Sequence, residues 1–407
     1  MSRTGLADLA GWVTEAGLAG QSEPAVLDGF CRRAGEAGCP IARAGIIIDT
    51  LHPVLEGRAF RWRGDGAGDE RTEVIEYGPS NEGEMAETWR RSVFFHMLEA
   101  GQSLYRCRIA AGQSAEFPAI AAWRDEGMTD YLALIARFAA RGVIGEMDCV
   151  YSYWATDHPH GFADGHVEAL AGLMPMLALA VKCASLGRIA GTLVETYLGR
   201  DAGRRVLGGL IRRGVAETIS AVLWFSDLRG FTGITDRTAP QQIIALLNDY
   251  ADAVISSVYD NGGDVLKLIG DGTLAIFTAD TNVEACRGAM AAHAAMRHRL
   301  EVLNERRAAE QQPITEVYLG LHVGDVSYGN IGSKDRLDFT VIGPAVNEVS
   351  RIAAMCRSAE RNVLMSAAFA EATAGPDRAS LVSVGRYALR GVERPQELFT
   401  IDPLAMR

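Results

Sequence analysis

Residues 217 to 407 show the clearest alternation between apolar and polar positions. Apolar runs of strand length occupy residues 218–226, 265–269, 274–277 and 316–323. Two stretches with helical spacing separate them, and we expect Thr238 and Thr281 to cap those helices at their N-termini. The order strand, helix, strand, strand, helix, strand is the ferredoxin-like arrangement, so this half of the chain predicts an α+β fold.

Residues 1 to about 185 predict a different domain. Helical spacing occurs in residues 6–16, 24–37, 84–100, 121–140 and 165–186, and strand patterns in 44–49, 56–63, 105–109 and 150–156. We expect helices around one antiparallel sheet. This order, together with the stretch YSYWATDHPHGFADGHVEALAGLMPMLALAVK, resembles a GAF-type sensor domain. The resemblance implies an α/β regulatory domain over residues 1–185, and an unidentified small molecule is one candidate for its ligand.

Residues 186–216 join these two regions. Apolar residues recur there at helical spacing in two groups, and Gly199 followed by Asp201 is typical of a break between two helices. No proline interrupts the run. We therefore expect a helical connector that transmits a signal and helps the chain to dimerise.

Two carboxylates stand at the ends of buried-strand patterns. Asp227 follows the apolar run 222–225, and Asp271 lies between Gly270 and Gly272 with an apolar run on each side. An unpaired buried charge is expensive, so a carboxylate in this position needs a partner. Two carboxylates at neighbouring strand ends suit a hard divalent cation, which takes the rest of its ligands from substrate phosphates. The alternative is that both residues only serve turns.

Three motifs in the second half resemble those of a known family. F-S-D-L-R-G-F-T begins at Phe225, K-L-I-G-D-G at Lys267 and D-F-T-V-I-G-P-A-V-N-E-V-S-R at Asp338. In this order they resemble the class III nucleotide cyclase catalytic domain, over roughly residues 190 to 400. The competing phosphate-binding motif, a P-loop, is absent from the sequence. Gly262-Gly263-Asp264 is not followed by Glu-Phe, which disfavours a diguanylate cyclase.

The resemblance implies a metal site and a phosphate site. Asp227 and Asp271 would bind two ions of Mg²⁺ or Mn²⁺ per active site, with the backbone carbonyl of Leu228 as a further ligand. The residues implied in contacts with the substrate phosphates are Gly230, Phe231 and Thr232, through their backbone N–H groups, and the side chain of Arg336.

The resemblance also implies how the nucleotide is recognised. Lys267 can donate to adenine N1 and Thr340 can accept from the 6-amino group, so this pair favours ATP. The pair resembles that of the adenylate-specific subgroup which includes bicarbonate-responsive enzymes. Asn347 matches the residue that orients the ribose. Arg351 matches the arginine that neutralises charge on the phosphates in the transition state.

The implied function is a soluble adenylate cyclase that converts ATP to 3′,5′-cyclic AMP and pyrophosphate under control of the N-terminal domain. In the family, one active site takes its aspartates and its base-binding residues from two chains. A chain that holds both sets is therefore expected to form a homodimer with two shared sites. Two alternatives stay open: a guanylate cyclase, and a catalytically idle nucleotide-binding module that dimerises.

Composition narrows the setting. A net charge of −11 over 407 residues disfavours a nucleic-acid binder. Seven cysteines without a C-x-x-C pair disfavour a disulfide framework and predict a reducing, cytoplasmic location. The N-terminus lacks an apolar signal-peptide core, and the most apolar segment, residues 169–181, is too short to span a bilayer. We therefore expect no membrane insertion and a buried helix at this segment.

Overall fold

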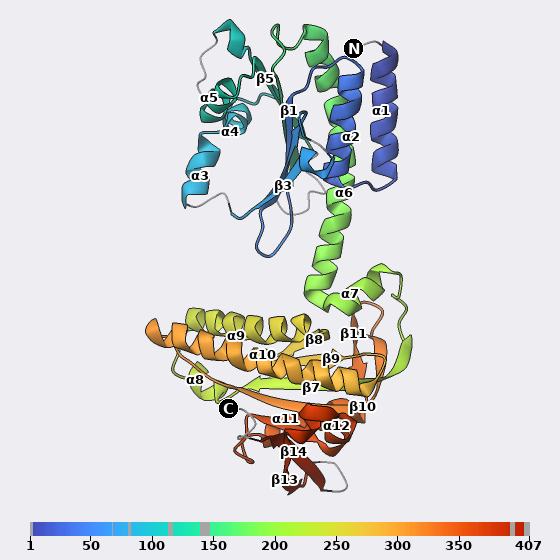
Figure 1. Ribbon diagram of the computed structural model, residues 1–407, viewed down its shortest axis with the longest axis vertical. Helices are drawn as coiled ribbons and strands as arrows, with labels where there is room; N and C mark the ends of the chain where they lie inside the picture. Colours follow the sequence, from blue (N-terminus) through green and yellow to red (C-terminus); the bar gives the residue numbers. More distant parts are fainter. Residues whose placement is uncertain are drawn as a thin grey trace. The chain divides into compact units, whose positions relative to one another are not determined.

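The structure, a computed structural model, describes residues 3–66, 68–79, 83–112, 117–138, 147–390 and 395–402. The chain forms two compact units and passes from one to the other between Leu193 and Val194. This division falls inside the predicted connector, and each unit is described by itself (Figure 1).

The first unit is built on a six-stranded sheet with antiparallel neighbours, in the order β3-β2-β1-β6-β5-β4. Its strands are β1 (Arg43–Asp49), β2 (Gly57–Arg63), β3 (Thr72–Tyr77), β4 (Leu104–Cys107), β5 (Asp130–Arg137) and β6 (Cys149–Thr156). Its helices are α1 (Arg3–Leu18), α2 (Glu23–Glu36), α3 (Gly83–Arg90), α4 (Val93–Glu99), α5 (Pro118–Asp125) and α6 (Asp164–Leu198), which continues past Leu193. The antiparallel sheet predicted for this region is confirmed.

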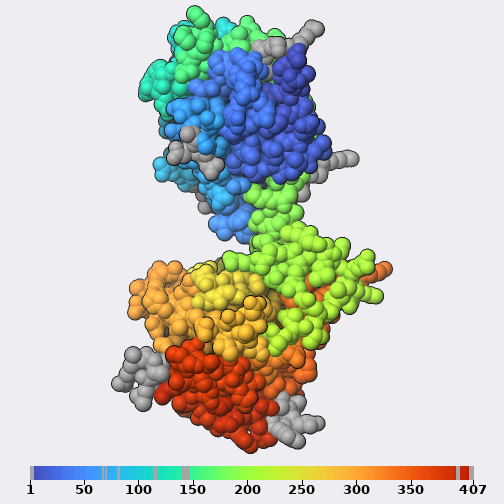
Figure 2. Space-filling model, turned by 45° about the vertical axis from the view of Figure 1, so that its right-hand side comes forward, coloured from blue at the N-terminus to red at the C-terminus, as the bar shows by residue number. Residues whose placement is uncertain are grey.

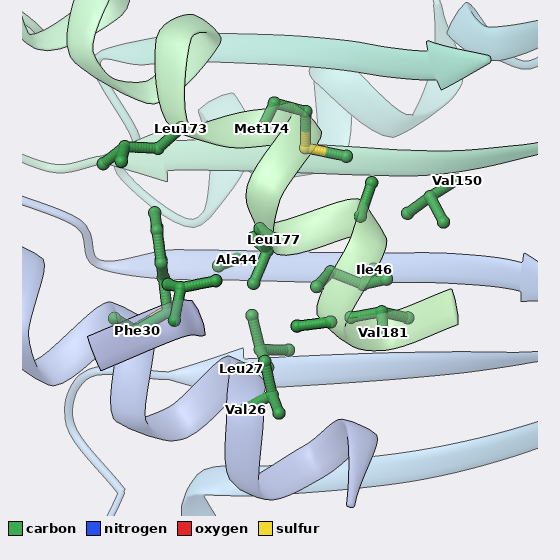
Figure 3. Close-up of a cluster of buried hydrophobic side chains, with 14 of the residues drawn as sticks. Val26, Leu27, Phe30, Ala44, Ile46, Val150, Leu173, Met174, Leu177 and Val181 are labelled. Atoms are coloured by element: carbon green, nitrogen blue, oxygen red, sulfur yellow. The ribbon is translucent and has the colours of Figure 1, made fainter. Parts of the chain in front are cut away.

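Helices α2 and α6 cover one face of this sheet, as the buried side chains in Figure 3 show. Phe30 of α2 and Leu177 of α6 lie in this layer with Ile46 of β1, and all three are buried. Consecutive residues of a strand point to opposite faces of the sheet. Val150 of β6 faces this layer, so the next residue, Tyr151, lies on the other face, in a second, aromatic-rich cluster with Phe94 of α4.

Two helix predictions in this unit are wrong. Residues 121–140 do not form one helix, because α5 ends at Asp125, Gly127 has a φ of 86°, and β5 follows. The first six residues of β5 are all buried, and a strand covered on both faces cannot be told from a buried helix by periodicity. The helix predicted over residues 84–100 is divided at Ser92, which caps α4 by accepting from the N–H of Phe95 at 3.1 Å.

Helix α6 has 35 residues and continues beyond the helix predicted over residues 165–186. Its length and the mean hydropathy of 1.8 in its most apolar 18-residue window would allow it to cross a membrane, and half of that window is buried inside the structure. Leu173, Leu177 and Val181 are among the buried positions, as expected for a core helix. The argument that this segment is too short to span a bilayer does not hold for the whole helix.

The second unit is built on an eight-stranded sheet in the order β13-β14-β12-β10-β7-β9-β8, with β11 paired to β10. Its strands are β7 (Ala216–Leu228), β8 (Gly263–Ile269), β9 (Gly272–Phe277), β10 (Val317–Gly332), β11 (Leu337–Ile342), β12 (Val363–Ser366), β13 (Leu381–Tyr387) and β14 (Gln396–Ile401). Its helices are α7 (Arg200–Leu207), α8 (Phe231–Thr235), α9 (Pro240–Asp260), α10 (Asn282–Ala309), α11 (Pro344–Met355), α12 (Ala367–Ala372) and α13 (Gly375–Ala379). The predicted order is confirmed in β7, α9, β8, β9, α10 and β10.

Helices α9 and α10 cover one face of this sheet (Figure 1), over a core that includes Trp224 and Tyr250. The other face carries α7, α11 and β11, whose buried side chains pack on Leu223 of β7. Figure 2 shows the surface of α9 and α10, yellow to orange, beside the red C-terminal segment, in agreement with the contacts between α10 and α12. The central strands β7 and β10 therefore have helices on both faces.

The two predicted helix caps differ in outcome. Thr281 caps α10, because its hydroxyl accepts from the N–H of Glu284 at 3.3 Å and donates to the Glu284 carboxylate at 3.1 Å. Thr238 does not cap α9: the cap is Ala239, in extended conformation, directly before Pro240. A residue before proline is driven out of the helical region, so the cap position is the one next to the proline.

Strand β10 is longer than the predicted strand over residues 316–323. In the sequence, the glycines of this segment suggest that the strand ends. In the structure, they allow other backbone segments to pack closely against β10. A Cβ on Gly320 would lie 2.6 Å from the carbonyl oxygen of Val349, so glycine lets α11 lie directly on the strand. A similar approach occurs at Gly329, where a Cβ would lie 2.2 Å from the carbonyl oxygen of Val215.

Candidate active site

Asp227 and Asp271 come together at one end of the second sheet. Asp227 lies near the end of β7, and Asp271 lies in the turn between β8 and β9. Gly270 has a φ of 63°, which favours glycine, and a Cβ on Gly272 would lie 3.0 Å from the carbonyl oxygen of Ser226. The two glycines therefore allow the turn to pack directly against β7.

The Asp271 carboxylate affects the ionisation of Asp227. Burial, followed by the hydrogen bond and the negative charge of Asp271, raises the pKa of Asp227 from 3.8 to about 6, while the backbone of Leu228 acts in the opposite direction. Two like charges this close disfavour the doubly ionised state unless a cation lies between them. The pair therefore has the electrostatics of a cation site.

A cavity of ≈ 210 Å³ opens beside the pair and is lined in part by Asp227, Leu228 and Asp271. Within the described ranges, no group of three or more His, Cys, Asp or Glu side chains could hold a metal ion. Two carboxylates provide only part of an octahedral set of ligands. This fits Mg²⁺ or Mn²⁺, which keep water and phosphate oxygens as further ligands, and it does not fit a closed all-protein site.

The predicted phosphate-binding segment follows β7 directly. Gly230 has a φ of 70° and starts α8. Its carbonyl oxygen accepts the first bonds of the helical turn, from the N–H of Gly233 at 3.0 Å and the N–H of Ile234 at 3.2 Å. The N–H groups of Phe231 and Thr232 precede these bonds and therefore have no helical acceptor.

Lys267 lies on β8 and reaches across to β11. A β-bulge between Val265 and Lys267 pairs the lysine with Leu274, whose side chain belongs to the face that carries β11. The extra residue of a bulge re-aims the side chains that follow it. The Lys267 ammonium donates to the Asp338 carboxylate, two residues before Thr340 on β11.

Asp338 was not among the site residues predicted from the sequence. Alternation along a strand would have placed it on the same face as Thr340. Its pairing with Lys267 depends on the bulge in β8, which the sequence does not signal. Arg336, a predicted phosphate contact, lies in the exposed loop before β11, where its backbone N–H donates to the Ser333 hydroxyl at 3.1 Å.

Asn347 and Arg351 lie four residues apart on α11, so they share one face of that helix. Asn347 is exposed and Arg351 is half-buried. The neighbouring Glu348 lies toward the sheet, with its carboxylate 3.6 Å from Nε2 of His322 on β10. Nδ1 of His322 lies 2.8 Å from the hydroxyl of Ser366, and burial lowers the pKa of this histidine.

The predicted residues form two separate sets in one chain. Asp227, Leu228 and Asp271 line the cavity, whereas Lys267, Thr340, Asn347 and Arg351 are not among its lining residues in the described part of the chain. Lys267 and Thr340 share the neighbourhood of β11, and Asn347 and Arg351 share a face of α11, which follows β11 in the chain. Within the described residues, one chain therefore does not bring the two sets together around this cavity.

The second unit thus has a ferredoxin-like core, with two aspartates near one strand end and a lysine on the adjoining hairpin. Residues 215–402 match the family model of the adenylate and guanylate cyclase catalytic domain. This part of the chain is therefore a class III cyclase catalytic domain.

Several known proteins are similar to this region. An adenylate cyclase from Anabaena cylindrica is 33% identical over 177 residues, which are 42% of this chain and 34% of that protein. Adenylate cyclase 1 from Rhizobium meliloti is 32% identical over 149 residues, which are 35% of this chain and 22% of that protein. The chain thus spans about a third or less of the length of these two relatives.

Among solved structures, the adenylyl cyclase CyaB from P. aeruginosa is 25% identical with a TM-score of 0.42, covering 46% of this chain and 95% of that chain. The guanylyl cyclase Cya2 is also 25% identical, with a TM-score of 0.41, covering 46% of this chain and 93% of that chain.

Proposed function

We propose that this chain is an adenylate cyclase that converts ATP to 3′,5′-cyclic AMP and pyrophosphate. The observation that carries the choice of ATP is the position of Lys267, which reaches β11 beside Thr340. An ammonium donor suits adenine N1, and a hydroxyl acceptor suits the 6-amino group. Two relatives that bear the name adenylate cyclase support the same choice.

Each predicted site residue has a proposed role in this reaction. Asp227 and Asp271, with the backbone of Leu228, would hold Mg²⁺ or Mn²⁺, which when bound neutralises the triphosphate and acidifies the ribose 3′-hydroxyl. The backbone N–H groups of Phe231 and Thr232, joined by those of Gly230 and the Arg336 side chain, contact the phosphates.

Asn347 orients the ribose so that its 3′-oxygen faces the α-phosphorus. The new bond forms between these two atoms, the bond from the α-phosphorus to the β-phosphate oxygen breaks, and the hydroxyl proton passes to solvent. Arg351 stabilises the charge that develops on the phosphates, a role suited to a planar guanidinium.

The separation of the two residue sets supports a homodimer with two shared sites. Each site would take the aspartates of one protomer and Lys267, Thr340, Asn347 and Arg351 of the other. The end of β8, next to the turn that holds Asp271, carries exposed apolar side chains: Leu268 and Ile269 are 55% and 48% exposed. Such side chains suit contact with a second copy.

We further propose that the first unit regulates the second. The antiparallel sheet between two layers of helices supports a GAF-like sensor, for which a small-molecule ligand remains a prediction. The proposed location is cytoplasmic, which is supported by seven cysteines that are all free thiols.

The test is nucleotide turnover by the full chain. With Mg²⁺ or Mn²⁺ and ATP, the wild type should form cyclic AMP, and Asp227→Asn should lose at least about a hundredfold in rate because one ligand of the metal is weakened. Glu305→Gln, on the exposed face of α10, is the matched control and should keep full activity.

The two alternatives predict other results. Faster turnover of GTP than of ATP would replace the proposal with a guanylate cyclase. Binding of ATP without turnover of either nucleotide would favour an idle binding module. An Asp227→Asn variant with wild-type activity would remove the metal assignment.

A further inference from the structure

Within the described residues, the Lys267–Asp338 pair is the one side-chain polar contact found for the two predicted base-binding residues, Lys267 and Thr340. Side chains of Lys267 and Asp338 are 37% and 42% exposed. An ion pair this exposed contributes little to stability by itself, so its role has to be sought in what the lysine does.

The pair joins two strands that are not bonded to each other in the sheet. β8 pairs with β9, and β11 pairs with β10. Lys267 and Asp338 are 71 residues apart in the sequence, and the bulge in β8 is what turns the lysine toward β11. The carboxylate therefore meets the lysine by tertiary placement.

The chemistry of the ammonium leaves room for a second partner. A lysine ammonium has three N–H donors and no acceptor. One N–H is directed to Asp338, which leaves two donors for a ligand. Thr340 lies two residues further along β11 and on the same strand face as Asp338, so a base that meets the lysine also meets the threonine.

We propose that Asp338 is a specificity residue that acts through Lys267: it holds the ammonium beside Thr340 and sets the preference for adenine over guanine. This inference rests on the proposed function. Adenine offers an acceptor at N1, which an ammonium held in place can satisfy. Guanine offers a donor at N1, which would need an acceptor, and the only carboxylate of this pair is already engaged by the lysine.

The Lys267–Asp338 pair therefore affects the binding of both purine bases. It presents a donor where adenine needs one, and it occupies the acceptor that guanine would need. Removing the carboxylate charge should free the lysine to adopt other rotamers, so that adenine loses an oriented donor. Guanine never used that arrangement and should be affected less.

The experiment measures binding separately from catalysis. Full-length protein with Mg²⁺ is titrated with 3′-deoxy-ATP and 3′-deoxy-GTP, which lack the attacking hydroxyl and cannot be cyclised. For Asp338→Asn we expect about three- to tenfold weaker binding of 3′-deoxy-ATP, typical of losing one charge-assisted contact at a partly exposed site, and a change of less than about twofold for 3′-deoxy-GTP.

Steady-state kinetics with ATP provides the second measurement. The KM of Asp338→Asn should rise by the same factor as the binding constant, with kcat within about twofold of the wild type, because the pair acts on the base and not on the reacting phosphate. Asp338→Glu keeps the charge and should recover most of the selectivity. Asp335→Asn, in the exposed loop before β11, is the matched control and should behave as the wild type.

Three outcomes would overturn the inference. Equal weakening for both nucleotides would make the pair a structural link between β8 and β11. Tighter binding of 3′-deoxy-ATP to Asp338→Asn would make Asp338 a competitor for the lysine. Unchanged binding would make the contact an ordinary surface ion pair.

The outcomes for the proposed function are distinct from these. A wild type that converts ATP while Asp338→Asn shows no selective loss would remove only the inference. A wild type that binds 3′-deoxy-ATP but converts no ATP would remove only the proposed function. A wild type that binds neither nucleotide would remove both.

Discussion

Burial, followed by the hydrogen bond and charge of the nearby Asp271, raises the pKa of Asp227 to about 6. Without a cation, the folded protein therefore carries an unfavourable charge pair above this pH. Two carboxylates that repel each other also attract a cation, so this destabilising arrangement suits a cation site. The cost should be visible as a loss of stability in the metal-free protein.

Asp271→Asn should raise the stability of the metal-free protein at pH 8. The pKa of Asp227 is 3.8 in ordinary surroundings and about 6 in the fold, so ionisation costs the folded state stability above pH 6 and nothing well below pH 4. After allowance for burial that the substitution does not relieve and for partial solvent exposure, we expect a gain of about 1 kcal/mol.

Calorimetric unfolding of the full chain in a chelator measures this gain. The stability gain of Asp271→Asn should decrease as the pH falls from about 6 toward 4. In this range Asp227 becomes protonated in the folded wild type, which removes the repulsion that the substitution relieves. Glu305→Gln should show no such pH-dependent gain. A lower unfolding temperature for Asp271→Asn at pH 8, or a gain that does not change with pH, would contradict the charge repulsion.

Helix α7 shows how an element predicted as part of a connector is held by the catalytic unit. The Asp201 carboxylate accepts from Arg205 Nε at 2.7 Å and from the Tyr328 hydroxyl on β10 at 3.0 Å. Further along, Asn330 donates its side-chain N–H to the carbonyl oxygen of Leu210 at 2.6 Å. The break at Gly199 was predicted, but the second helix ends at Leu207 and is docked on the sheet.

Tyr328→Phe should loosen α7 without unfolding the unit. The variant keeps the buried ring and removes the hydroxyl, so the Asp201 carboxylate loses one partner, at a cost of about 1–2 kcal/mol. Hydrogen exchange measured by mass spectrometry should show faster exchange across residues 200–207. Tyr387→Phe on β13 is the control, and equal protection of α7 in both variants would mean that packing alone holds the helix.

At the level of the whole molecule, the distribution of site residues is the main finding. The cavity beside the aspartates has no lining from Lys267 or Arg351 within the described chain, although one chain carries all of them. In the proposed homodimer, the second copy would supply the residues that this cavity lacks. Activity should therefore depend on protein concentration.

Mixing two inactive variants tests this pairing. Asp227→Ala removes one half of the site and Arg351→Ala the other, so each homodimer is inactive. If the subunits exchange freely, half of the dimers carry both variants, and each of these has one intact site, which predicts about a quarter of the wild-type activity. Mixtures that remain inactive at concentrations where both variants are dimeric would exclude shared sites.

Local sequence patterns were sufficient to predict much of the second unit. The order of β7 to β10, the cap at Thr281 and the positions of Asp227 and Asp271 at a strand end and a glycine-flanked turn could all be predicted. These features depend on periodicity and turn chemistry, which neighbouring residues determine. The metal, substrate and ribose roles stay predictions that rest on the family's motifs.

Other features depend on contacts between distant parts of the chain, and only the tertiary structure determined these. β5 is a strand because helices bury it on both faces of its sheet. β10 continues beyond Val323 because residues 324–329 pair with residues 216–221 of β7. The contact between Lys267 and Asp338, 71 residues apart in the sequence, depends on the bulge in β8. A pattern of apolar and polar positions specifies which face a side chain takes, but the partner on that face comes from strands and helices that only folding brings near.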